Sequence, residues 1–213
     1  MSKETDMHEN NIDTAARILE AAEEEFMEKG YGNAKMMSIA ARAGVSHSML
    51  HYYYRSKEKM FQMIFDGKAQ LIVSILEGIS GKGLNFHEVI TQFVKNQFNL
   101  MMENDRFIWF IIDELLHNEE NVTKVIDIVK PKLGEYLRWF NEELDKETKA
   151  GNIKRITARD LIMNIVSLNA STFMYIPVLK KLEPEINVDV YLEGRRNANA
   201  EFVWNAIKND KKQ

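Results

Sequence analysis

The stretch Ser38–Lys59, SIAARAGVSHSMLHYYYRSKEK, decides the fold of this 213-residue chain. It consists of an alanine-rich segment, a Gly-Val-Ser turn and a second short segment that ends in three tyrosines. Glycine adopts the left-handed conformation that ends a helix at little steric cost, and Ser46 is a favourable N-cap for the helix that follows. Because two short helices joined at a glycine are typical of a helix-turn-helix, we expect that motif here.

The spacing of apolar residues gives the predicted helix-turn-helix a buried face and an exposed face. Residues that share one face of a helix recur every three or four positions. The expected inward positions are Ile39, Ala40, Ala43, Leu50 and Tyr54. The expected outward positions are His47, Ser48, Met49, His51, Tyr52 and Tyr53. The outward face therefore offers hydrogen-bond donors, aromatic rings and a thioether.

The charge of the chain is unevenly distributed. The whole chain has a formal net charge of −4, and residues 1–30 carry three basic residues against nine acidic ones. Residues 31–60 instead carry five basic residues (Lys35, Arg42, Arg55, Lys57 and Lys59) against one acidic residue, Glu58. A local basic patch indicates phosphate binding even in an acidic chain.

The order of these features resembles the DNA-binding domain of the TetR (tetracycline-repressor) family over about residues 14–65. The shared features are an Ile-Ala pair, Gly-Val-Ser, a leucine four positions on, an aromatic run and Ser-Lys-Glu. Two positions depart from the family pattern: Ala34 and Lys35 replace the usual Thr or Ser, and His51 replaces the usual Tyr. Both positions face DNA in the family, so the function class is implied while the target sequence stays open.

The resemblance implies a role for each outward residue. His47, Ser48 and Met49 would read base edges from the start of the recognition helix, with His51 as a further base or phosphate contact. Lys57 would clamp a phosphate at a helix start, and the tyrosine hydroxyls would contact phosphates, although either tyrosine could instead belong to the core. The predicted DNA-binding set is Lys35, Met37, Ser46, His47, Ser48, Met49, His51, Tyr52, Tyr53 and Lys57.

The rest of the chain predicts an all-α fold of about nine helices. Prolines are few, with three in the chain, and Ala, Leu, Glu and Lys are strong helix formers. We expect a disordered arm at 1–12, a helix-turn-helix domain at 13–58 and a regulatory and dimerisation domain at 59–213. A long helix at about 57–80 connects the two domains, and Pro131 predicts a kink or break near 129–130. The remaining helices are expected at about 13–29, 37–43, 47–53, 85–103, 105–118, 120–150, 157–182 and 188–207.

The predicted regulatory domain carries two sets of candidate residues. In the resembling family the two C-terminal helices of two subunits form a four-helix bundle, which implies a dimer interface at Leu161, Ile165, Leu168, Phe202 and Trp204. The resemblance also implies a small-molecule pocket between the fourth and eighth helices. Its candidate lining is Phe93, Gln97, Met101, Trp109, Asp113, Tyr136, Phe140, Asn169 and Phe173. The same large side chains could simply form the core, and the sequence names no ligand beyond favouring an apolar one.

Several function classes are disfavoured. The chain has no cysteine, and no nucleophile elbow, phosphate loop or dinucleotide motif is present, so we expect neither an enzyme nor a cofactor. His47 and His51 have metal-ligand spacing, but no carboxylate or thiol lies nearby, so we expect no metal. The polar first dozen residues lack the apolar part of a signal peptide. The longest apolar runs, such as Phe107–Ile112, fall short of the ~20 residues of a membrane span, so we expect a cytoplasmic protein.

The sequence therefore predicts a homodimeric, ligand-responsive DNA-binding transcriptional regulator. A repressor that binds a palindromic operator and is released by a small molecule fits these features best. The alternative is a helical protein-interaction module that uses its helix-turn-helix to bind a protein partner.

Overall fold

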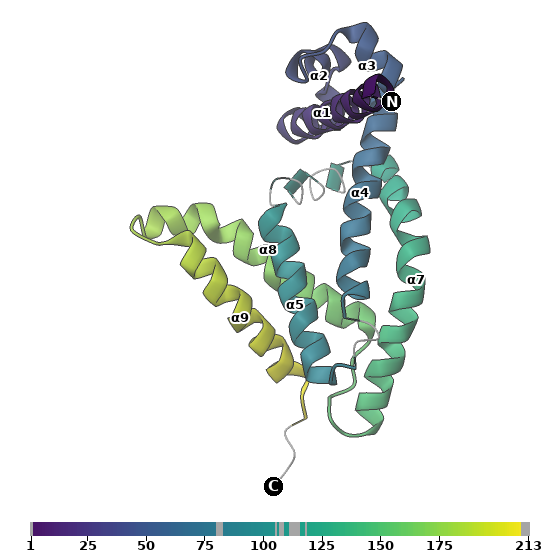
Figure 1. Ribbon diagram of the computed structural model, residues 1–213. Coiled ribbons are helices and arrows are strands. Elements are labelled where there is room, and N and C mark those ends of the chain that lie inside the picture. Colours follow the sequence, from purple (N-terminus) through teal and green to yellow (C-terminus); the bar gives the residue numbers. More distant parts are fainter. Residues whose placement is uncertain are drawn as a thin grey trace. The chain divides into compact units, whose positions relative to one another are not determined.

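The computed structural model describes residues 2–79, 83–104, 106, 109–110, 116–117 and 119–209. These residues form helices and no named strand, which confirms the predicted all-α fold (Figure 1). The helices are α1 (Ser2–Asn33), α2 (Met36–Arg42), α3 (His47–Tyr53), α4 (Lys57–Glu77), α5 (Phe86–Glu103), α7 (Glu119–Lys149), α8 (Ala158–Leu182) and α9 (Val188–Ile207). Most of the helix predicted at about 105–118 lies outside the described residues.

The chain divides into two compact units. The first, here called the head, comprises Met1–Ala69 and Arg106–Ile128; the second, the body, comprises Gln70–Asp105 and Val129–Gln213. We had expected the boundary near residue 58. It lies further along α4 because Phe61, Ile64 and Phe65 are buried in the hydrophobic core of the head.

The start of α1 differs from the prediction. We had expected a disordered arm at 1–12, whereas the backbone is helical from Ser2. Residues 2–13 contain no glycine or proline, so no helix-breaking residue prevents α1 from extending to Ser2. Gly30 has φ 72° and ψ 159° and breaks the helical geometry near the C-terminus of α1, where the sequence predicted its end.

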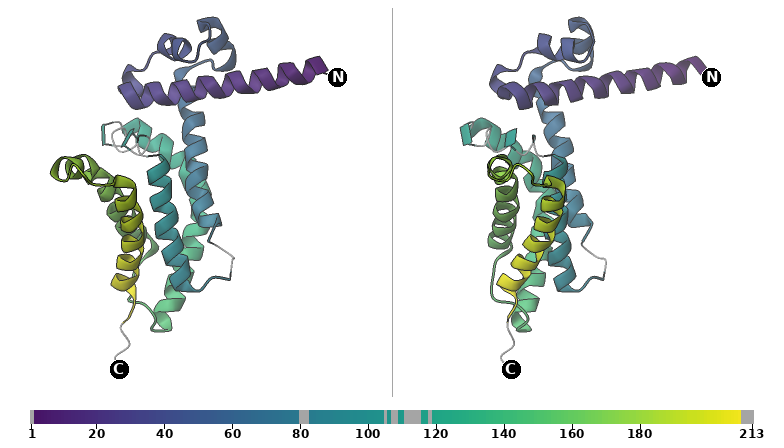
Figure 2. Two further views of the ribbon diagram at one scale, coloured as in Figure 1. Left: turned by 60° about the vertical axis from the view of Figure 1, so that its left-hand side comes forward. Right: turned by 90° about the vertical axis from the view of Figure 1, so that its left-hand side faces the viewer.

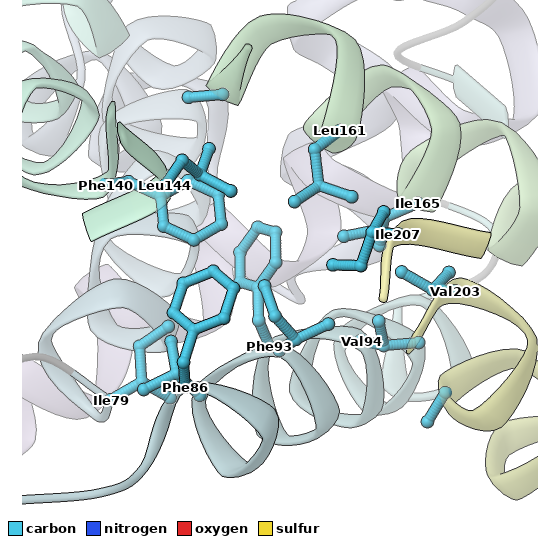
Figure 3. Packing of buried hydrophobic residues seen from close by; sticks show 14 of the residues in the cluster. Ile79, Phe86, Phe93, Val94, Phe140, Leu144, Leu161, Ile165, Val203 and Ile207 are labelled. Atoms are coloured by element: carbon cyan, nitrogen blue, oxygen red, sulfur yellow. The ribbon is translucent and has the colours of Figure 1, made fainter. Parts of the chain in front are cut away.

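The core of the body lies among α5, α7, α8 and α9. α5 makes the most extensive contacts of the body, with α9 and with α8. α8 and α9 form a hairpin joined by a short loop (Figure 2). Buried residues from all four helices meet in one cluster, including Phe93, Phe140, Leu161 and Val203 (Figure 3). α5 begins with a capping box, since Asn85 and Glu88 each accept a hydrogen bond from the other's backbone N–H.

Of the kink or break predicted near 129–130, the break is wrong, and a kink stays a prediction. α7 is helical without interruption from Glu119 to Lys149 with Pro131 inside it. Pro131 is exposed, so water can bind the backbone carbonyl one turn earlier that loses its N–H partner.

One helix among the described residues is long and apolar enough to cross a membrane by length and composition. This helix is α8, with a mean hydropathy of 1.4 over its most apolar window. The sequence-based expectation rested on unbroken apolar runs and missed it. α8 packs against both α5 and α9, and 22% of its most apolar window is buried.

Candidate functional site

The turn between α2 and α3 is fixed by a glycine and a serine. Gly44 has φ 65°, and its N–H donates to the Ala41 carbonyl while the Val45 N–H donates to the Ala40 carbonyl. These two bonds form a Schellman motif, which satisfies carbonyls left free at the end of a helix. The Ser46 hydroxyl then accepts a hydrogen bond of 3.2 Å from the Met49 N–H and caps α3. The predicted helix-turn-helix is therefore confirmed in its local geometry.

The inward face of α3 is attached firmly to the rest of the head. Leu50 is fully buried and Tyr54 is 5% exposed, as predicted. The Tyr54 hydroxyl donates a 3.0 Å hydrogen bond to the Ala15 carbonyl of α1. Burial raises the pKa of Tyr54, so this hydroxyl keeps the proton that it donates.

The outward face of α3 presents the side chains that we expected to read DNA. His47, Ser48, Met49 and His51 are exposed, and Tyr52 is 79% exposed. The His47 and His51 rings meet edge to face with centroids 4.5 Å apart. A rigid backbone thus carries an accessible row of polar and aromatic groups.

The remaining members of the predicted DNA-binding set are divided between surface and core. Lys35 and Met37, at the start of α2, are exposed, and so is Ser46. Tyr53 is half-buried and packs against the head core, which makes it the tyrosine with a structural role. Its ring lies 5.4 Å from that of Tyr52.

Lys57 does not present a free ammonium group. Its Nζ donates to the carbonyls of Tyr31, Gly32 and Ala34 at 2.6, 3.3 and 3.1 Å, and it lies 4.5 Å from the centre of the Tyr31 ring. A lysine has three N–H donors, and all three are used here. The predicted phosphate clamp is therefore corrected to a structural tie between the start of α4 and the end of α1.

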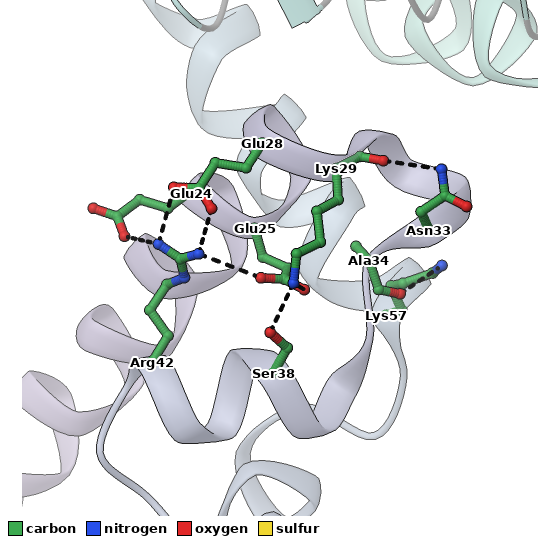
Figure 4. Close-up of polar contacts among 9 residues, drawn as sticks. All are labelled: Glu24, Glu25, Glu28, Lys29, Asn33, Ala34, Ser38, Arg42 and Lys57. Atoms are coloured by element: carbon green, nitrogen blue, oxygen red, sulfur yellow. Dashed lines mark hydrogen bonds and ion pairs between the residues drawn. The ribbon is translucent and has the colours of Figure 1, made fainter.

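Arg42 is also engaged inside the head. Its guanidinium donates to Glu24 at 2.9 Å, to Glu28 at 2.6 Å and to Glu25 at 3.4 Å (Figure 4). Hydrogen bonds to Glu28 and Glu24 raise the pKa of Arg42, and the bond from Arg42 lowers the pKa of Glu28. Of the five basic residues counted in the basic patch, Lys35, Arg55 and Lys59 remain as exposed side chains.

Glu25 is a functional residue of the head that the sequence did not reveal. Its side chain is fully buried, although it lies in the acidic N-terminal part of the chain. Lys29 of α1 pairs with it at 2.8 Å and also donates to the Ser38 hydroxyl of α2 (Figure 4). Desolvation raises the pKa of Glu25, but the bonds from Lys29, Ser38 and the Lys35 backbone outweigh it, so the pKa lies below its ordinary value. The available signal for its burial was its position four residues after Ala21 and three after Ala22, which places it on the buried face of α1.

The family model described as "Bacterial regulatory proteins, tetR family" matches residues 18–64, which contain α2, α3 and the start of α4. Residues 18–64 therefore form a DNA-binding domain of the TetR family. Among curated TetR-like relatives, the Bacillus subtilis HTH-type transcriptional regulator YdgC is 25% identical over 170 residues, covering 75% of this chain and 87% of YdgC. The Bacillus subtilis fatty acid metabolism regulator protein is 25% identical over 166 residues, covering 74% of this chain and 82% of that protein.

Solved structures extend the TetR fold to the body. A Clostridium perfringens protein described as a candidate fatty acid metabolism regulator is 22% identical, with a TM-score of 0.70 over 91% of this chain and all of that one. Bacillus subtilis FadR in complex with stearoyl-CoA is 21% identical, with a TM-score of 0.61 over 90% of this chain and 98% of that one. The fold of both units is therefore that of these solved structures, while the family-model match to residues 18–64 identifies the chain as a DNA-binding transcriptional regulator.

The residues predicted to line a ligand pocket have several different environments. Phe93 and Phe140 are buried, with ring centroids 5.8 Å apart, and Met101 is buried as well. Phe173 packs on Phe98 with centroids 4.9 Å apart. Trp109 is 38% exposed and belongs to the head unit, and Asp113 lies outside the described residues.

The polar members of that predicted set are joined in buried hydrogen bonds. Asn169 donates to Gln97 and to the Val94 carbonyl, the latter at 3.1 Å, and Asn199 donates to Asn169 at 2.9 Å. This network links α5, α8 and α9, and two of its members, Gln97 and Asn169, were predicted to line the pocket. Tyr136 donates a 3.0 Å hydrogen bond to Glu77, and desolvation together with this bond raises the pKa of Tyr136.

The predicted dimer residues need correction as well. Leu161 and Ile165 are 1% and 0% exposed because they point into the core of their own subunit, which leaves no area for a partner. Leu168 and Trp204 are partly buried against the same core, whereas Phe202 is 64% exposed. The sequence missed a second set of exposed apolar residues on α8 and α9: Met163, Met174, Tyr175, Val178, Leu182 and Val190.

Proposed function

We propose that this TetR-family protein is a cytoplasmic homodimeric repressor that binds a palindromic operator through α3. The observation that carries the proposal is the outward face of α3, where His47, Ser48, Met49, His51 and Tyr52 are all exposed on a capped, well-anchored helix. Residues at the start of such a helix read base edges, while exposed cations nearby neutralise phosphates. Here those cations are Lys35, Arg55 and Lys59.

The exposed apolar residues of α8 and α9 support the dimer. On α8, Met163, Met174 and Val178 recur at the spacing of one helix face, and Phe202 lies exposed on α9. An exposed apolar patch of this kind marks an interaction surface. A two-fold dimer would present two α3 helices to half-sites one DNA turn, about 34–36 Å, or a small multiple apart.

Two relatives support an apolar effector with an acyl chain. One is named a fatty acid metabolism regulator, and the solved FadR structure holds stearoyl-CoA. We propose that a fatty-acyl compound bound in the body weakens operator binding. Because α4 runs from the head into the body, it offers a continuous path for the coupling. An efficient switch requires about a 10⁴-fold preference of the ligand for the DNA-incompetent state.

The test is selection of DNA fragments from the intergenic region upstream of the gene, followed by fluorescence anisotropy with the selected duplex. His47→Ala and Tyr52→Ala should each weaken specific binding by roughly tenfold or more, since each removes an exposed contact. Lys149→Ala, an exposed change at the end of α7, is the matched control and should leave affinity unchanged. Affinity should also fall steeply as salt rises.

Two results would contradict the proposal. One is the absence of any duplex bound more tightly than random DNA. The other is binding that survives the combined His47→Ala and Tyr52→Ala substitutions. Salt-insensitive capture of a protein partner without DNA affinity would favour the protein-interaction alternative. Addition of stearoyl-CoA tests the effector separately, because failure to release the duplex contradicts the effector alone.

A further inference from the structure

The body contains an open cleft of about 790 Å³ away from the residues predicted to bind a ligand. It is lined by Ile79 just after α4, by residues that precede and begin α5, and by residues at and just beyond the C-terminal ends of α7 and α9. None of the predicted pocket residues lines it. Its size is within the range of sites for small organic ligands, which span roughly 300–1,000 Å³.

Aromatic rings from three helices line the cleft. Trp139 comes from α7, Trp204 from α9 and His87 from α5. The His87 and Trp204 rings are in contact, with centroids 4.5 Å apart. Both tryptophans are partly buried, so each ring is held on one side by the core and leaves another part open to the cleft. Fixed aromatic surfaces of this kind favour a flat aromatic ligand, which can stack on them.

The cleft lining carries two acidic residues, Glu143 and Glu147, and two basic residues, Lys146 and Lys208. Glu143 pairs with Lys146 at 3.5 Å, and the Glu147 carboxylate accepts a 2.7 Å hydrogen bond from Asn152. Lys208 is half-buried and lines the cleft, and its ammonium has no ion pair within the described part of the chain. A half-buried ammonium is stabilised by an anion, so a ligand with one carboxylate can be held at the part of the cleft that Lys208 lines.

We propose that this cleft is a second small-molecule site, and that it binds a planar aromatic carboxylate. The ring system stacks on Trp204 and Trp139, and the carboxylate accepts a hydrogen bond from the Lys208 ammonium. The effector proposed above is defined by its aliphatic acyl chain, whereas this ligand is defined by an aromatic ring system and one carboxylate. The proposal concerns binding to the body alone and holds whether or not the protein represses transcription.

Isothermal titration calorimetry of the full chain tests the site with three probes: 2-naphthoate, 2-naphthalenemethanol and 2-naphthylmethylamine. These probes share one aromatic system and differ in charge. We expect 2-naphthoate to bind with a Kd below about 1 mM, with the alcohol weaker by roughly threefold to fivefold and the amine weaker still. Lys208→Met should remove the preference for 2-naphthoate over the alcohol. Lys180→Met, an exposed change on α8, should leave that preference unchanged.

The aromatic contacts are tested with a matched tryptophan pair. Trp204→Ala should weaken both 2-naphthoate and the alcohol by about tenfold, whereas Trp109→Ala, in the head unit, should weaken neither. Because Trp204 also packs on the core, thermal unfolding of each variant is recorded, and His87→Ala replaces Trp204→Ala if the latter does not fold. Absence of 2-naphthoate binding to the native protein overturns the proposal. Equal affinity for the three probes also overturns it. So does wild-type affinity for 2-naphthoate in both Trp204→Ala and His87→Ala.

Discussion

Lys57 is the residue whose role the structure changes most. Three backbone carbonyls at the end of α1 converge on its Nζ, and the Tyr31 ring covers the same ammonium. Carbonyls at the end of a helix lack intrahelical partners, so a cation there satisfies them and also interacts favourably with the helix dipole. One side chain thereby joins the first helix of the head to the fourth.

Replacing Lys57 by Met should therefore destabilise the fold. Met keeps an apolar stem of similar length but removes all three donors, so we expect the free energy of unfolding to fall by about 2 kcal/mol. Urea denaturation followed by far-UV circular dichroism measures this loss. Lys59→Met is the matched control, because Lys59 is exposed, and it should change stability by less than about 0.5 kcal/mol. Equal midpoints for the two variants would show that the carbonyl contacts contribute nothing.

At the scale of elements, α2 is held on α1 by a charged cluster. Glu24, Glu25 and Glu28 of α1 surround Arg42 at the end of α2, and Lys29 reaches the start of α2 through Ser38 (Figure 4). Glu25 is the buried member of this cluster. Since α2 supports α3, the cluster fixes the orientation of the outward face of α3.

Glu25→Gln tests this cluster and its pH dependence. The change keeps the shape of the side chain but removes the charge that Lys29 and Arg42 share, so we expect a loss of about 2 kcal/mol near neutral pH. The pKa of Glu25 lies below its ordinary value of about 4.3. The contribution of ionised Glu25 to the free energy of unfolding is therefore complete above that value. It is lost as the pH falls through the lower pKa of the folded state.

Urea midpoints of both proteins across the acid range provide the measurement. The difference between wild type and Glu25→Gln should be full at neutral pH and should shrink as the solution becomes more acidic. Glu24→Gln is the control, because its side chain is 42% exposed and its pair with Arg42 should contribute under about 1 kcal/mol. A difference that grows toward low pH would refute the assignment.

At the scale of the whole molecule, the exposed apolar residues of α8 and α9 predict how two subunits meet. Phe202 is 64% exposed in a single chain, whereas Leu161 and Ile165 are buried in the core of their own subunit. Interface energy concentrates in a few large side chains that a partner covers. Phe202 is therefore the residue on which the proposed dimer should depend most.

Phe202→Glu should dissociate the dimer without unfolding the subunit. Burying a carboxylate against an apolar partner is unfavourable, and we expect at least about 2 kcal/mol of lost association energy, a roughly 30-fold weaker dimer. Sedimentation equilibrium should show the 24.8 kDa monomer for the variant and twice that mass for wild type. Ile126→Glu, at an exposed position of α7 in the head unit, should remain dimeric. A dimeric Phe202→Glu would place the interface elsewhere.

The sequence by itself determined the helices and the helix-turn-helix, because the signals involved act over a few residues. Gly44 ends α2, Ser46 caps α3 and Asn85 with Glu88 starts α5, and each of these interactions spans at most five positions. The inward residues Ile39, Leu50 and Tyr54 were equally predictable, since burial follows from helical periodicity. α9 was also predicted with both ends correct.

Only the tertiary structure decided what the charged and polar side chains do. Lys57 meets a carbonyl 26 residues away, Arg42 meets Glu28 14 residues away and Asn169 meets Gln97 72 residues away. The partner of a long polar side chain depends on how helices pack, and periodicity does not contain that information. For the same reason Leu161 and Phe202 looked alike in sequence, although one faces the core of its own subunit and the other faces outward.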